Sequence, residues 1–273
     1  MSHEVTIQSN SPAMHALPRT IGIFILVSLV VFAVLVPFVW SPGSAEQDFT
    51  AILSGPVQAH PLGTDNLGRD MLARLSAAVG LALGFALIVV ITAAVPGILL
   101  GILAAWTGGV IDKCLSLLAE LLLALPRLLL ILLVVASMPG SFLALYGAVA
   151  LVSWTEYFHR TRALSLTVLA SPAVTSSSQQ RPGPLYVIRR QLWPELSSML
   201  IPLCASGAAS AIMVLATLGF LGLGVSPPTA EPGVMISELL QYYAAAPFSF
   251  ALPIVVIFLL VFSLLLIGGG RKR

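Results

Sequence analysis

The chain has 273 residues, of which 58% are hydrophobic and only 9% are charged, and its formal net charge is +2. A water-soluble domain carries about 25% charged residues, so this composition excludes a fully hydrated protein and indicates one solvated mainly by lipid. The basic residues form no dense patch interleaved with aromatic residues, so nucleic acid is not an expected partner. The sequence therefore predicts an all-α integral membrane protein in contact with the lipid bilayer.

Apolar segments recur along the chain and predict about six membrane-spanning helices, because a helix needs about 20 apolar residues to cross the hydrocarbon core. The predicted spans are residues 21–40, 77–106, 111–138, 142–157, 198–225 and 248–267. Residues 1–20 form a polar tail, and the apolar run that follows is too long for a signal-peptide core, so we interpret it as an uncleaved signal-anchor. A loop at 41–76 separates this first span from the main membrane domain, residues 77–270.

The distribution of Lys and Arg predicts the orientation of these spans, because cytoplasmic loops carry an excess of basic residues. The segments on one side contain Arg19, Lys113, Arg160, Arg162, Arg181, Arg189, Arg190, Arg271, Lys272 and Arg273. The segments on the other side contain only Arg69 and Arg74. We therefore expect both termini and the segment 171–195 in the cytoplasm, and the loop 41–76 outside.

The external loop contains the most polar stretch of the chain, HPLGTDNLGRD at residues 60–70. His60, Asp65 and Asp70 are residue types that bind metal ions, but their spacing matches no established ligand pattern. The proline and glycines predict a turn, and Asp65 followed by Asn66 resembles the cap of a helix that leads into the second span. We favour a structural turn, with an intramembrane enzyme that uses these three side chains as the alternative.

Two charged residues, Glu120 and Arg127, interrupt the third predicted span, where charge is costly. Seven residues separate them, which places both on one face of a continuous helix, about 10 Å apart along its axis. They are interpreted either as part of a translocation path or as contacts with a partner subunit. A self-sufficient secondary carrier that uses Glu120 as an ion relay is an alternative of a different class.

The cytoplasmic segment 171–195 has the pattern of a short helix. Ser171 is a favoured N-cap and Pro172 a favoured first helical residue, which predicts a helix over 172–180 before a Pro-Gly bend. Such a helix between two spans suits docking to a cytoplasmic protein, and an ordinary loop is the alternative. The lysines, Lys113 and Lys272, do not follow glycine, so the chain has no phosphate-binding P-loop for ATP.

The stretch HPLGTDNLGRDMLARL at residues 60–75 closely resembles the signature of C-type permease subunits of the peptide/nickel ABC importer family. The resemblance continues through residues 108–112, then Glu120 and Pro126, then Trp154, Tyr157 and Arg162, and later FLGLGVSPPTAEPG at 220–233. Together these motifs cover residues 60–242 in the family's order. The signature residues of the first motif are His60, Pro61, Gly63, Thr64, Asp65, Gly68, Arg69 and Asp70.

The resemblance implies a type I importer permease in the bacterial inner membrane that forms a path for peptides or for nickel, free or chelated. It implies a second permease subunit, two cytoplasmic ATPases that use the ATP, and an extracytoplasmic solute-binding protein as partners. It implies no catalytic, cofactor or metal site in this chain, which would therefore not be an enzyme. The Pro-Thr-Ala-Glu run at 228–231 and the short external loops resemble nickel-type members slightly more.

The resemblance also implies a coupling loop for the ATPases, where the family carries an Ala-Ala-x-x-x-Gly motif. That motif falls on Ser176, Ser177 and Arg181, so both alanines and the glycine are replaced. The expected coupling residues are Ser176, Ser177, Arg181, Gly183, Tyr186, Arg189, Arg190 and Pro194. Other departures are His159 in place of arginine and Pro232 in place of tryptophan, and a diverged copy with weakened coupling is a further alternative.

Overall fold

The computed structural model describes residues 13–171 and 184–269. Within this part the chain is helical and has no named strand, apart from isolated bridges in the loop after the first helix. The longer helices are α1 (Ala13–Val39), α2 (Met71–Thr107), α5 (Phe142–Leu169), α8 (Trp193–Phe220) and α10 (Pro247–Gly269). The shorter elements are α3 (Gly109–Leu123), α4 (Arg127–Ala136), α7 (Pro184–Val187), a π-helical turn (Ile188–Leu192), α9 (Pro232–Leu239) and a 3₁₀ turn (Leu240–Tyr242).

Four of the described helical segments are long and apolar enough to cross a membrane: Leu17–Val39, Met71–Thr107, Ile188–Phe220 and Pro247–Gly269. The pair α3 and α4 adds a fifth if it is one span, although the two helices are bent by 78°. The all-α membrane fold is thus confirmed. The prediction of a continuous third span is wrong, because the helix ends at Leu123 and resumes at Arg127. Pro126 lies in this break, where it lacks a backbone N–H and disfavours helical geometry at Leu125.

The fourth predicted span, 142–157, is the N-terminal half of the longer helix α5, whose 28 residues extend about 42 Å. This helix is not among the segments apolar enough to span by composition, because its second half contains Glu156, Arg160 and Arg162. Two other boundaries also move outward, since α2 begins at Met71 and α8 at Trp193. The predicted spans are shorter than these helices because a polar residue interrupts an apolar run, whereas a helix can continue through polar residues.

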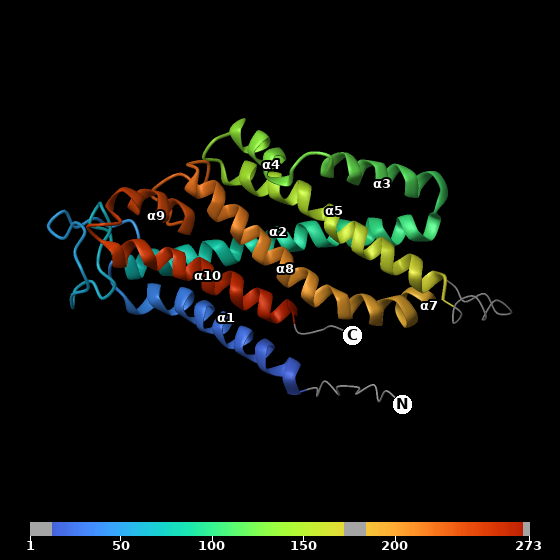
Figure 1. Cartoon of the computed structure of the whole chain (residues 1–273), viewed down its shortest axis with the longest axis horizontal. Helices are drawn as coiled ribbons and strands as arrows, with labels where there is room; N and C mark the ends of the chain where they lie inside the picture. The colour runs from blue at the N-terminus through green and yellow to red at the C-terminus, as the bar shows by residue number, and fades with distance from the viewer. Residues whose placement is uncertain (1–12, 172–183, 270–273) are drawn as a thin grey trace, which may run out of the picture.

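Helix α2 lies at the centre of the bundle and packs against α1, α5 and α8, while α10 packs against α1 and α8 (Figure 1). Small residues permit the closest contact, between α2 and α5. A Cβ on Gly97 would lie 2.6 Å from the Cβ of Tyr157, and one on Gly101 would lie 2.9 Å from the carbonyl oxygen of Phe158. Close packing of this kind is the main source of helix association in lipid, where apolar burial offers little.

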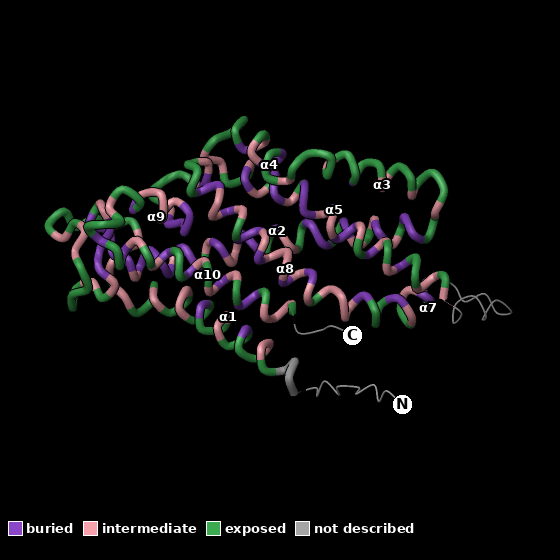
Figure 2. Tube along the Cα trace, in the orientation of Figure 1, coloured by how far each residue is buried: buried purple, intermediate pink, exposed green. Residues whose placement is uncertain are grey.

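Buried residues concentrate on the faces of α2, α5 and α8 that meet inside the bundle, whereas α3 is exposed along nearly its whole length (Figure 2). The exposed surface of α3 is itself apolar and includes Val110, Leu117, Leu118 and Leu121. A face of this composition is suited to lipid or to another membrane helix.

The two ends of the bundle carry different segments (Figure 1). The loop between α1 and α2 lies at one end together with α9. The turn between α2 and α3, the end of α5 and α7 lie at the other end. The first turn of α1 and the last turn of α10 point toward this second end, as the predicted orientation with both termini on one side requires.

Candidate functional site

The predicted external motif folds as a compact turn that seats the start of α2. Gly63 and Gly68 have φ angles of 76° and 72°, which favour glycine. A Cβ on Gly68 would lie only 1.9 Å from the carbonyl oxygen of Asp48, so no other residue fits there. Asp70, and not Asp65, is the N-cap of α2: its Oδ1 accepts a hydrogen bond from the backbone N–H of Ala73 at 2.8 Å.

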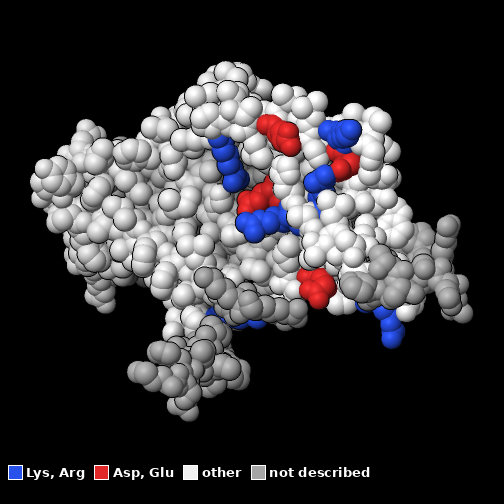
Figure 3. Space-filling model, turned by 45° about the vertical axis from the view of Figure 1, so that its right-hand side comes forward, with Lys and Arg blue, Asp and Glu red and all other residues white. Residues whose placement is uncertain are grey.

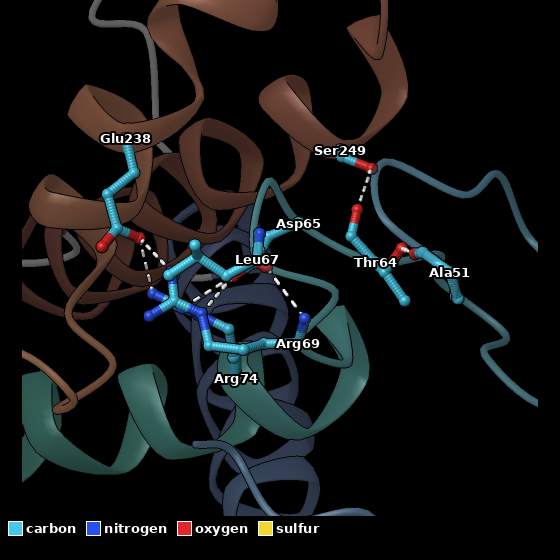
Figure 4. Close-up of polar contacts among 8 residues, drawn as sticks. All are labelled: Ala51, Thr64, Asp65, Leu67, Arg69, Arg74, Glu238 and Ser249. Atoms are coloured by element: carbon cyan, nitrogen blue, oxygen red, sulfur yellow. Dashed lines mark hydrogen bonds and ion pairs between the residues drawn. The ribbon is translucent and has the colours of Figure 1, made fainter. Parts of the chain in front are cut away.

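Asp65 is buried and lies at the centre of an ion-pair network (Figure 4). Its Oδ1 accepts from the backbone N–H groups of Leu67 and Arg69, at 2.8 and 2.9 Å. Its Oδ2 accepts from Arg69 Nε at 2.6 Å and from Arg74 Nη1 at 2.7 Å. Both guanidinium groups also bind Oε2 of Glu238, at 2.7 and 2.9 Å.

The network has equal numbers of acidic and basic groups, so its charges compensate one another. Asp65, Arg69 and Arg74 are at most 2% exposed. Burial raises the pKa of Glu238, and the nearby Arg69 partly offsets this effect. Since Glu238 belongs to α9, the network joins the external turn and the start of α2 to a helix more than 160 residues away in sequence.

The three residues considered as metal ligands do not form a metal site. His60 and Asp70 face each other, with Nδ1 and Oδ2 2.9 Å apart, but both carboxylate oxygens of Asp65 are directed to backbone amides and to the two arginines. Across residues 13–171 and 184–269, no group of three or more His, Cys, Asp or Glu side chains could hold a metal ion. Thr64 completes the turn, accepting from the N–H of Ser54 at 2.9 Å and donating to the carbonyl of Ala51.

The other predicted pair, Glu120 and Arg127, is separated by the break between α3 and α4. Glu120 is exposed on α3, whereas Arg127 is the first residue of α4 and is partly buried. Arg127 donates to the hydroxyls of Ser153 on α5 and Ser210 on α8, at 2.7 and 3.2 Å. The expectation that both charges share one helix face is therefore wrong, because the two helices are bent by 78°.

Arg127 lines a pocket of about 320 Å³ between the α3–α4 break and α5. The other lining residues are Leu123, Val152, Thr155, Glu156, His159 and Arg160. Figure 3 shows acidic and basic side chains gathered around a hollow on one face, while most of the remaining visible surface is uncharged. The sequence analysis missed Glu156 as a site residue, since nothing in the sequence relates it to Arg127 on another helix.

The end of the bundle that the charge distribution predicts to be cytoplasmic carries the predicted coupling segment. Ser176, Ser177, Arg181 and Gly183 lie outside the described residues. The chain then forms α7 and a π-helical turn that continues into α8, whose second residue is Pro194. Tyr186, Arg189 and Arg190 are exposed there, whereas Val187 and Leu192 are buried and anchor the segment to the bundle.

A nearby ion pair stabilises the same end. Arg162 on α5 donates to both carboxylate oxygens of Asp112 in the first turn of α3, with Nη2 2.6 Å from Oδ2. This bidentate contact ties the exposed helix α3 to the end of α5 from which the coupling segment continues.

Comparison with known proteins identifies the family of this multi-pass helical chain. Residues 97–268 match the family of binding-protein-dependent transport system inner membrane components. The chain belongs to this family and is a multi-pass permease of the bacterial inner membrane.

Several relatives align over almost the whole chain. It is 34% identical over 258 residues to the dipeptide transport system permease protein DppC of Haemophilus influenzae, covering 92% of this chain and 88% of that protein. It is 35% identical over 257 residues to the di/tripeptide transport system permease protein DppC of Pseudomonas aeruginosa, with 92% and 85% covered. The nickel transport system permease protein NikC of Escherichia coli is 29% identical over 249 residues, with 91% and 90% covered.

Proposed function

We propose that this chain forms the membrane path for small peptides in an ATP-driven importer. The observation that carries the proposal is similarity over 92% of the chain to dipeptide and di/tripeptide permeases, at 34% and 35% identity. The sequence contains no P-loop, which supports a subunit that depends on separate ATPases. In this proposal the chain itself catalyses no reaction and binds no cofactor.

The proposed assembly contains a second permease, two cytoplasmic ATPases and an extracytoplasmic peptide-binding protein. The exposed apolar face of α3 supports a neighbouring membrane subunit, and the exposed Tyr186, Arg189 and Arg190 support docking of an ATPase at the inner end. In this assembly, closure of the ATPases would move the end of α8 through the π-helical turn at Ile188–Leu192.

Uptake of a labelled dipeptide, in cells with and without the chain, tests the substrate class. We expect dipeptide uptake to be lost with the chain and restored by it, and labelled nickel uptake to be unaffected. Loss of nickel uptake alone would favour the nickel alternative. Uptake that continues without the ATPases, but stops when the proton gradient is collapsed, would instead identify a secondary carrier.

Crosslinking tests the assembly. A cysteine at Ser177 should form a crosslink with a cytoplasmic ATPase of the complex, whereas a cysteine at Ser44, in the loop at the opposite end of the bundle, should form none. If Ser177→Cys reacts only with a reagent confined to the outer face, both the orientation and the docking role are refuted.

A further inference from the structure

Arg127 is partly buried, and among the described residues it has no carboxylate partner. Arg69 and Arg74 are paired with Asp65 and Glu238, and Arg162 is paired with Asp112. Arg127 contacts only serine hydroxyls, and its buried Nε has no hydrogen-bond partner among the described residues. A guanidinium placed among apolar helices is costly, and hydroxyl dipoles solvate it without neutralising its charge.

Glu156 is the complementary case in the same pocket. It is partly buried on α5, and in the described part of the chain its carboxylate forms no ion pair within 4.0 Å, neither with Arg127 nor with Arg160 one turn further along the helix. The pocket therefore holds charges of both signs that do not compensate each other directly. A ligand that brings one positive and one negative group would satisfy both.

We propose that this pocket is a binding site for a zwitterionic peptide, in which Arg127 binds the C-terminal carboxylate and Glu156 binds the N-terminal ammonium. The assignment rests on the proposed function and adds the residues that recognise the substrate. Arg160 lines the same pocket and contributes a second positive charge. Ser153 and Ser210 are positioning residues that hold the guanidinium of Arg127.

The dimensions of the pocket agree with a short peptide. Its volume of about 320 Å³ is at the lower end of the range for small-molecule sites, which is about 300–1,000 Å³. Leu123 and Val152 supply apolar wall for the side chains of the peptide.

Binding of uncharged analogues to the complete importer, purified in nanodiscs without its binding protein, tests the proposal. Leaving out the binding protein removes a second component that recognises peptide termini. The probes are alanyl-alanine, its N-acetyl derivative and its C-terminal amide, each titrated by calorimetry. We expect each blocked form to bind at least about tenfold more weakly than the free dipeptide, because a buried charge then loses its partner.

The variants assign each terminus to a residue. In Glu156→Gln, the free and N-acetylated dipeptides should bind alike, while the amide remains the weaker ligand. In Arg127→Gln, the free dipeptide and its amide should bind alike, while the N-acetyl form remains the weaker ligand. Lys113→Gln is the matched control, since Lys113 is an exposed cation on α3 outside the pocket, and it should preserve both differences.

Three outcomes overturn the site. They are no saturable binding of the free dipeptide, equal binding of all three probes to the unaltered complex, and discrimination that survives both substitutions. If cells still require the chain for peptide uptake in these cases, the proposed function stands and only the pocket is wrongly assigned. If the chain supports nickel uptake and not peptide uptake, the proposed function itself fails.

Discussion

The substitution Asp65→Asn should strongly destabilise the external end of the bundle. Asparagine retains an oxygen that can accept from the backbone N–H groups of Leu67 and Arg69, but its amide nitrogen would face Arg69 Nε and Arg74 Nη1, which are both donors. Two buried guanidinium groups would then share Glu238 as their only carboxylate. Breaking one side of a buried ion pair costs about 3–5 kcal/mol.

The melting temperature of the detergent-solubilised chain measures this effect. For a domain of roughly this size, 1 kcal/mol corresponds to about 2–4 °C, so a decrease of at least about 6 °C is expected. Asp48→Asn is the matched control: its carboxylate is exposed, and the amide oxygen of asparagine can replace the Oδ1 that accepts from the N–H and hydroxyl of Thr50. The other oxygen of Asp48 lies 4.0 Å from His60 Nε2, too far for a hydrogen bond. We expect a change within about 0.5 kcal/mol there. Equal melting temperatures for the two variants would refute a stabilising role of the network.

Two further predictions concern the same end of the molecule. Gly68→Ala should greatly reduce the amount of folded protein, because residue 68 has a φ of 72° and the new Cβ would clash with the carbonyl of Asp48. The control Gly55→Ala should express normally, since a Cβ there has no neighbour within 4 Å. Immunoblots of membranes compare the amounts of the two variants. Burial raises the pKa of Glu231 from 4.5 to about 7. The native state therefore retains a proton that the unfolded state releases. Its contribution to the free energy of unfolding is fully present below pH 4.5 and is lost as the pH rises through about 7, by roughly 3 kcal/mol. Melting curves should show this decline in the unaltered chain and a weaker one in Glu231→Gln, and parallel curves would contradict it.

The membrane fold was predictable because composition alone excludes water as the solvent of most side chains. The apolar runs located the four most apolar spans, and the charge distribution predicted which segments share an end of the bundle. The break at Pro126 was also visible in the sequence, but the apolar residues on both sides favoured one continuous span. Lipid-facing helices are apolar whether they are straight or bent, so hydropathy does not locate a bend.

In the motif at residues 60–70, the sequence predicted local features and did not predict contacts with distant residues. The turn at its glycines was correctly predicted, because backbone conformation is a local property. The partner of Arg69 and Arg74 was not predicted, since Glu238 is brought there only by the packing of α9. Likewise, Arg127 and Glu156 lie in one pocket because α4 folds back onto α5.

The two sets of charged residues differ in a way that suits different roles. In the network of Asp65, Arg69, Arg74 and Glu238, each charge is in direct contact with an opposite charge. Such pairing holds the joined segments in position and leaves little net electrostatic potential to attract a charged ligand. In the pocket lined by Arg127 and Glu156, Arg127 is bound only by hydroxyl groups, and Glu156 pairs with no cation of the described chain. Both charges can therefore still attract an oppositely charged group of a ligand. Uncompensated charge in a membrane protein lowers stability, and its retention is understandable where a ligand supplies the missing counter-charges during transport. The ion-pair network is therefore suited to maintaining the fold, and the pocket is suited to the proposed peptide site.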